Sequence, residues 1–343
     1  MTEAATTQKV RSRGLKTWSA FGNLGRRPTE YEILTHNLNH TNGVIPLEMG
    51  PDVHGNVWLR EHRDSIKLTL PDWDAFRDPD AVTYGSYMAG QDDQETYIEG
   101  LLEQFDRDGY DALLPSGTLD LLGRALTPSR YLAHGLQMLS AYIQQLAISS
   151  YISNCAVFQT ADELRRVQLT AYRTTQLQLS YPDRGYGTGE RAIWESAPEW
   201  QPIRRAVELA LIEYDWDRAL VVTNLVVKPV TDLLLLHRLG KQFSTIGAHL
   251  DALILENLWR DSERSQRWTK ALIELLTQSD TGNLTVLQGY LDEFAPLGQA
   301  IVEAGSHLLV TPDGGQGASE VAAEVSSGWV EQLEAVGLKL GSG

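Results

Sequence analysis

The chain has 343 residues, of which 45 are acidic and 29 basic, giving a net charge of -16. This acidity argues against general nucleic-acid binding, since Lys and Arg side chains carry most of that affinity. A single cysteine, Cys155, excludes an intrachain disulfide and an all-cysteine metal site.

Residues 1–90 contain frequent prolines and glycines, which leave little room for long helices. We predict a largely irregular N-terminal arm, meaning residues 1–90, that packs on the rest of the chain and on another protein. Its candidate interface residues are aromatic and arginine side chains of the kind enriched at interfaces: Trp18, Arg26, Arg27, Tyr31, Trp73 and Phe76. The alternative that the aromatic residues pack on this chain's own helices stays open.

From residue 91 the pattern changes to apolar residues at three- and four-residue spacing, which predicts helices. The expected helices cover residues 91–105, 128–150, 154–180, about 198–238, 243–278 and 283–308. Strand patterns are almost absent. We therefore predict an all-α protein whose long-helix bundle spans 91–310, followed at 311–343 by a glycine-containing hinge and a short C-terminal helix.

Membrane association is not expected. The N-terminus lacks the apolar core of a secretory signal, and the stretch ALVVTNLVV and the leucines after it are interrupted by Asn224, Lys228 and Asp232. With one cysteine and no targeting segment, the sequence predicts a cytoplasmic protein.

One helical turn resembles a metal-binding motif that has lost a ligand. In di-iron helix bundles the motif is Glu-x-x-His, which places two ligands on one face of a helix. Here ADELRRVQLT has Glu163 followed by Arg166, and DSERSQRW has Glu263 followed by Gln266. Arginine has no lone pair to offer a metal. These four residues are degenerate ligand positions, and we predict no metal-binding residue in this chain.

The rest of the sequence supports that prediction. Residues 128–150 contain no acidic side chain, and neither do residues 219–231. His36 and His40 are four apart but lie in an Asn- and Thr-rich segment that predicts a loop. No nucleophile motif and no glycine-rich nucleotide loop is present, so we expect neither catalytic nor cofactor-binding residues.

A simpler interpretation of the first turn is an ion pair at the surface. On a helical wheel the apolar stripe consists of Val157, Leu164, Val167 and Ala171, and Glu163 and Arg166 lie beyond its edge. That arrangement favours solvated side chains, with the apolar stripe facing the core.

Four ordered blocks resemble a known family. GRRPTEYEILTHNLNHT, LPDWDAFRDPDAVTYGSY, GQDDQETYIEGLLEQF and NCAVFQTADELRRVQ are similar to the beta, or small, hydroxylase subunit of soluble bacterial multicomponent di-iron monooxygenases. In that family alpha and beta share a ferritin-like fold, and only alpha keeps the di-iron ligands. The alpha-type pattern Asp-Glu-x-Arg-His falls on residues 162–166, where the histidine is replaced by Arg166.

The resemblance implies a non-catalytic subunit that supports a di-iron alpha subunit in an alpha2beta2 hydroxylase. The implied further partners are a coupling protein and a reductase that carries NADH-derived electrons through FAD and a 2Fe-2S cluster. The start TWSAFGNLGRRPTEYEI is nearest the propane and tetrahydrofuran branch, which implies hydroxylation of propane or a related alkane or cyclic ether.

An alternative from another functional class is a self-sufficient ferritin-like di-iron oxidase with unrecognised ligands. It would need other carboxylates that converge in the bundle. The available candidates are Glu95, Glu99, Glu208, Glu213 and Glu256.

Overall fold

The structure is a computed structural model that describes residues 21, 24–36, 38, 52–310 and 317–341. Within these residues all regular structure is helical, which confirms the all-α prediction. The α-helices are α1 (Glu30–Thr35), α2 (His54–Arg63), α3 (Tyr84–Arg107), α4 (Ser116–Leu121), α5 (Ser129–Leu146), α6 (Ser150–Ser180), α7 (Glu190–Ser196), α8 (Gln201–Ala210), α9 (Trp216–Val221), α10 (Lys228–Asp232), α11 (Leu239–Thr245), α12 (His249–Ser279), α13 (Gly282–Gly305) and α14 (Ala318–Glu334).

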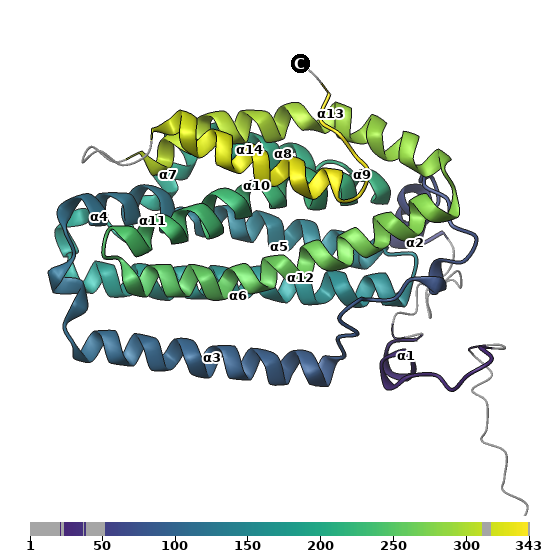
Figure 1. The fold of residues 1–343 in the computed structure, drawn as a ribbon, viewed down its shortest axis with the longest axis horizontal. Coiled ribbons are helices and arrows are strands. Elements are labelled where there is room, and N and C mark those ends of the chain that lie inside the picture. The colour runs from purple at the N-terminus through teal and green to yellow at the C-terminus, as the bar shows by residue number, and fades with distance from the viewer. Residues whose placement is uncertain (1–20, 22–23, 37, 39–51, 311–316, 342–343) are drawn as a thin grey trace, which may run out of the picture.

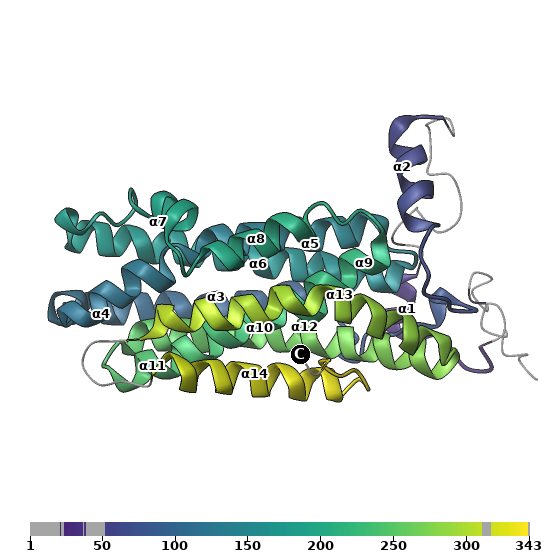
Figure 2. The same ribbon diagram turned by 90° about the horizontal axis from the view of Figure 1, so that it is seen from above.

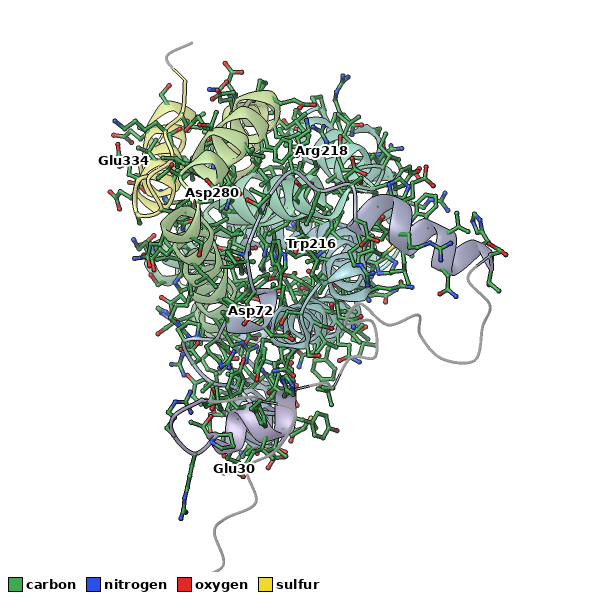
Figure 3. The ribbon with its side chains drawn as sticks, turned by 90° about the vertical axis from the view of Figure 1, so that its right-hand side faces the viewer. Glu30, Asp72, Trp216, Arg218, Asp280 and Glu334 are labelled. Atoms are coloured by element: carbon green, nitrogen blue, oxygen red, sulfur yellow. The ribbon has the colours of Figure 1, made fainter. Side chains whose placement is uncertain are left out.

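The long helices lie side by side in an elongated bundle (Figures 1 and 2). Helices α5 and α6 form a hairpin that packs against the run from α9 to α11 and against α12. Helices α13 and α14 cover one side of the bundle, and α3 runs along the opposite edge (Figure 1). Viewed end-on, Trp216 lies among the helices near the centre of the section, whereas Glu30 marks α1 at its lower edge (Figure 3).

One predicted helix is two helices in the structure. The stretch expected at about 198–238 is broken after α8, and a continuous helical run begins at Trp216 and ends at Thr245. Two π-helical segments, Val222–Val227 and Leu233–Arg238, flank α10 within this run. Pro229 follows the first of them, where the regular hydrogen-bond ladder is already interrupted and its missing N–H is tolerated.

The run from Trp216 to Thr245 is the most apolar part of the bundle. Its most apolar window has a mean hydropathy of 1.8, which by length and composition would suffice to cross a membrane, contrary to the sequence expectation. Every residue of that window is buried among the other helices, as expected for the central helix of a bundle.

The segments before and after the bundle pack closely on it. Helix α3 begins at Tyr84, earlier than predicted, with Thr83 and Ser86 forming a capping box. Upstream of it, Leu68 and Phe76 are buried in the main core. Helix α14 inserts Trp329 against α13, so these parts share one core with the bundle. The domain boundaries at 90 and 310 stay predictions.

Candidate functional site

The turn that holds Glu163 and Arg166 lies in the middle of α6 and faces the interior. Their exposed fractions are 2% and 3%, whereas Leu164 between them is 46% exposed. The helical-wheel interpretation is therefore wrong, because the apolar stripe faces outward and the charged side chains face inward. Sequence periodicity could not show this, since it identifies the two faces of a helix but not which of them is covered.

The partners of this turn come from α10. Lys228 Nζ donates a short hydrogen bond to Glu163 and lies 2.8 Å from Asp232 Oδ2. Arg166 Nη1 lies 2.8 Å from Asp232 Oδ1 and 3.7 Å from Glu163 Oε2. All four side chains are buried, and together they form the central ionic cluster. Two of the polar residues that interrupt the apolar stretch in the sequence are thus paired charges in the core.

A neutral polar layer extends this cluster along the same helices. Gln159 Nε2 donates to Asn224 Oδ1 at 3.0 Å. Residues 224, 228 and 232 are four apart on one helix, and residues 159, 163 and 166 follow similar spacing on α6, so both sets face the shared interface. On α12, the Ser262 hydroxyl donates to Asp232 at 2.7 Å. All four central helices therefore contact this polar layer, since Ser140 of α5 accepts from Gln159.

The charges of the central ionic cluster balance, with two carboxylates facing one ammonium and one guanidinium. Burial opposes ionisation of Asp232, but the adjacent Lys228 and Arg166 charges outweigh it and hold the pKa of this carboxyl below its usual value. Burial likewise opposes the charge on Lys228, and the Asp232 and Glu163 carboxylates reverse the effect and raise the pKa of this ammonium. Lys228 and Asp232 are therefore both ionised at neutral pH, which is the paired state that a dry interior tolerates.

This cluster does not fit a metal ion. Two carboxylates face the centre: Glu163, and Asp232, which lies one residue beyond the acid-free stretch noted in the sequence. Glu163 Oε1 and both oxygens of Asp232 already accept from Lys228 or Arg166, neither of which offers a lone pair in its charged form. Within the part of the chain that the structure describes, Glu163 Oε2 has no hydrogen-bond partner and lies 3.7 Å from Arg166 Nη1. Among the described residues, no group of three or more His, Cys, Asp or Glu is placed to hold a metal. We therefore derive no step through iron in this chain.

The second degenerate turn does not join the cluster. Glu263 is exposed and accepts a hydrogen bond from Trp259 on its own helix, and Gln266 reaches only the Ser262 hydroxyl, at 3.3 Å. The expected correspondence between Glu163 and Glu263 is wrong because the inward residue of α12 at this level is Ser262. A single serine in a helical pattern carries no specific signal, so the sequence could not have identified Ser262 as the residue that faces the cluster.

A second buried ionic cluster lies on the α3 side of α6. Arg165 donates to Asp261 at 2.9 Å and makes a short contact with Glu95, and Arg264 makes a short contact with Asp162. Burial and the neighbouring Asp261 charge raise the pKa of Asp162 to about 7, although Arg264 opposes the shift. The sequence analysis missed this cluster, whose signal was the pairing of acidic and basic residues within 162–166 and 261–264.

Most of the predicted interface residues that the structure describes pack against other residues of this same chain. Tyr31 and Phe76 are buried in its core, and Trp73 packs edge-on against Trp216 with ring centres 5.8 Å apart. For these three the alternative interpretation holds, because α1, which contains Tyr31, and the segment from 52 to 83, which contains Trp73 and Phe76, both pack on the bundle. Arg26 is half-exposed and pairs with the buried Glu32 at 2.7 Å, and Arg27 is exposed. Trp18 lies outside the described residues.

The carboxylates proposed for a self-sufficient oxidase do not converge. Glu99 and Glu256 are exposed, Glu208 pairs with Arg204 on the surface, and Glu213 pairs with Arg218. Glu95 reaches only the edge of the second cluster through Arg165. The arrangement gives that alternative no ligand set.

Of the histidine pair that the sequence raised, the structure describes only one member. His36 ends α1 and lies 3.5 Å from the Tyr151 hydroxyl, while His40 lies outside the described residues. Cys155 is buried, and burial raises the pKa of its thiol well above the usual value, which leaves it unreactive.

Comparison with known proteins places this architecture in a family. The chain matches the family model described as Methane/Phenol/Alkene Hydroxylase over residues 58–280. Because the match covers more than half of the chain, this protein belongs to that family, and the predicted resemblance is confirmed.

Individual relatives refine the comparison. The chain is 39% identical over 297 residues to the toluene-4-monooxygenase system hydroxylase component subunit beta of Ectopseudomonas mendocina, which is 86% of this chain and 90% of that one. It is 26% identical to the propane 2-monooxygenase hydroxylase component small subunit of Rhodococcus jostii, over 77% of this chain and 72% of that one. The sequence analysis placed the chain nearest the propane and tetrahydrofuran branch, but its identity to the toluene-system subunit is higher than its identity to the propane-system subunit.

Solved structures agree with the fold. A chain of toluene 4-monooxygenase with toluene bound in its resting active site aligns with a TM-score of 0.82 and 38% identity, covering 87% of this chain and 98% of that chain. A chain of phenol hydroxylase from Pseudomonas sp. OX1 aligns with a TM-score of 0.80 at 19% identity, over 99% of both chains. The second match speaks for the fold alone, and both support the predicted ferritin-like bundle.

Proposed function

We propose that this chain is the non-catalytic beta subunit of a cytoplasmic di-iron monooxygenase hydroxylase and supports a metal-bearing alpha subunit. The observation that carries the proposal is the central ionic cluster. The chain belongs to a family of hydroxylases, yet in the middle of its bundle Lys228 and Arg166 pair with the only two carboxylates of the cluster, which belong to Glu163 and Asp232. Such a centre can stabilise a fold, but its carboxylates are paired with cations, and no histidine among the described residues joins them to complete a di-iron ligand set.

The chemistry therefore has to come from another subunit. In the assembled enzyme, the alpha subunit would hold the di-iron site, and a reductase with NADH, FAD and a 2Fe-2S cluster would supply electrons with a coupling protein. The work of this chain is to fold rigidly and to hold its partner, most simply as alpha2beta2. We propose a small hydrocarbon as the substrate class, because relatives are named for the hydrocarbons toluene and propane.

Iron content after purification tests the proposal. The chain is expressed alone and also with the product of a neighbouring gene that encodes two Glu-x-x-His turns, and iron is measured by mass spectrometry. We expect no stoichiometric iron in the chain alone and two irons per large subunit in the complex. Two irons per isolated chain would contradict the proposal and revive the self-sufficient oxidase.

Glu163→Gln provides a matched variant. It removes one carboxylate from the centre while keeping the side-chain shape, so a scaffolding subunit should still support turnover once the complex is assembled. If the centre bound catalytic iron, the same variant would abolish oxygenation in an intact complex.

A further inference from the structure

Helix α6 is built with its charged residues inside. The structure describes every residue of this helix, and all of its ionisable acidic and basic side chains are buried: Asp162, Glu163, Arg165, Arg166 and Arg173. The exposed positions between 151 and 179 carry no charge: Val157, Leu164, Gln168, Tyr172, Thr175 and Leu179. We call these six residues the outer face of α6.

Helix α12 provides an internal comparison. It has the same length, 31 residues, and also contributes charged residues to the buried clusters. Its exposed positions between 250 and 277 are all charged: Glu256, Arg260, Glu263, Arg267 and Lys270. One helix of this pair is therefore solvated in the usual way, whereas the other presents Tyr172 at 54% and Leu179 at 78% exposure. Depletion of charge together with exposed large apolar groups marks a protein interface.

Together with the exposed side of α5, the outer face is large enough for a stable contact. From Val157 to Leu179 it extends about 33 Å, from the rise of 1.5 Å per residue. Helix α5 packs beside α6, and its exposed positions also include no Asp, Glu, Lys or Arg: they are His134, Met138 and Gln145. A strip two helices wide, about 20 Å, gives an area of about 650 Å². That is close to the roughly 800 Å² per partner of a standard interface.

We propose that the outer face of α6 is the surface on which the metal-bearing hydroxylase subunit docks. This inference rests on the proposed function and names the place of contact. A straight stripe at helical spacing fits a long helix of the partner packed ridge into groove, and the proposed partner is itself a long-helix bundle. In this arrangement a single turn performs two tasks, because Glu163 and Arg166 close the core while Leu164 faces the partner.

The charge of the surface argues for this occupant over two others. A reductase or a coupling protein that binds and leaves during turnover would be steered by charged groups, and the outer face has none. A second copy of this chain would bring together two molecules of net charge -16, which repel each other at moderate ionic strength. A permanent heterologous subunit needs neither steering charges nor self-complementarity.

Cysteine footprinting tests the contact without disrupting it. The native Cys155 is buried and provides little background, so Leu164→Cys introduces one reactive thiol on the outer face, and Arg260→Cys introduces the matched thiol on α12. We expect maleimide to label both variants in the isolated chain. In the complex with the large subunit, labelling at 164 should slow by tenfold or more while labelling at 260 stays unchanged.

A disruptive variant gives a second readout. Leu164→Glu should weaken binding to the large subunit by tenfold or more without changing the melting temperature of the isolated chain, since the side chain is exposed. Ile212→Glu, at an exposed apolar position away from α6, should leave binding unchanged.

The outcomes separate the two proposals. Equal labelling at residue 164 in the free and bound chain, with an intact complex, overturns the docking surface and leaves the proposed function standing. Protection at 164 in the isolated chain also overturns it, by showing a second copy if the chain is dimeric or another part of this chain if it is monomeric. A chain that holds two irons and recruits no large subunit overturns the proposed function itself.

Discussion

Replacing Lys228 by methionine should strongly destabilise the fold. The change keeps the length of the side chain but removes the ammonium that lies between Glu163 and Asp232. Two carboxylates then share Arg166, whose Nη1 is 2.8 Å from one and 3.7 Å from the other. One negative charge is left uncompensated in a site where all the groups are buried.

The expected magnitude follows from how the protein can relieve that charge. At an effective dielectric constant of about 20, the lost 2.8 Å contact with Asp232 corresponds to roughly 6 kcal/mol of attraction, and the lost contact with Glu163 is of similar size. The lost desolvation cost of the ammonium offsets much of this attraction. The folded variant can instead take up a proton on one carboxylate. Moving a pKa from about 4 to 7 costs about 4 kcal/mol, at 1.36 kcal/mol per unit. We therefore expect a loss of about 3 to 5 kcal/mol at pH 7.

The proton taken up by a carboxylate in Lys228→Met also determines how the loss of folding stability depends on pH. In the variant a carboxylate has a raised pKa in the folded state, so the folded state binds more protons than the unfolded state above pH 4. The loss of stability should accordingly shrink to about 1 to 2 kcal/mol at pH 5 and grow toward pH 7. The free energy of unfolding is measured by urea titration followed by circular dichroism at both pH values.

Two further variants define the control. Lys228→Met combined with Glu163→Gln restores charge balance and should recover most of the lost stability. Lys270→Met removes an exposed lysine whose partner on α12 is Glu274 and should cost under about 0.5 kcal/mol. The reasoning is refuted if Lys228→Met costs less than about 1 kcal/mol, or if the double variant is no more stable than the single one.

Two other predictions concern the second ionic cluster and the packing of α13. Burial and the adjacent Asp261 charge raise the pKa of Asp162 from 3.8 to about 7, so the stability that its protonated form contributes is lost as pH rises through 7. The free energy of unfolding of wild type relative to Asp162→Asn, measured by urea unfolding, should therefore fall by about 2 to 3 kcal/mol between pH 5 and pH 8. A difference that stays constant over this pH range would contradict the prediction. Gly298→Ala would place a methyl group 2.4 Å from the Trp329 ring and should cost about 1 to 3 kcal/mol of folding stability. The control Gly289→Ala, on the same helix, meets nothing within 4 Å and should be neutral or stabilising by up to about 1 kcal/mol. Equal melting temperatures for the two variants would show that α14 moves to accommodate the methyl group.

Helix content and the family could be predicted from the sequence because both depend on local information. Apolar spacing indicated the helices now seen as α5, α6, α12 and α13, with ends that differ by up to six residues. The first residues of the helix expected at 243–278 belong to α11. The replacement at Arg166 was visible as a missing imidazole without any structure. The break after α8 was missed because the stretch between α8 and α9 keeps its apolar residues, and the π-helical segments have no periodic signal of their own.

The direction in which α6 faces could not be predicted. Its apolar and charged residues form two faces, and a wheel assigns the apolar one to the core, as for most helices. Here the assignment reverses, because Arg166 meets Asp232 and Arg165 meets Asp261 across other helices. These partners lie 66 and 96 residues away in the sequence, beyond the reach of any local pattern.

The sequence by itself determined that this protein is helical, that it belongs with the hydroxylase components and that its first metal-like turn has an arginine in place of a histidine. These are properties of residue type and of short-range spacing. Only the tertiary structure decided that Lys228 and Asp232 complete the centre, that Glu263 does not, and that Leu164 and its neighbours face outward. Pairing energies and burial depend on which helices come together, and that is a property of the packed chain as a whole.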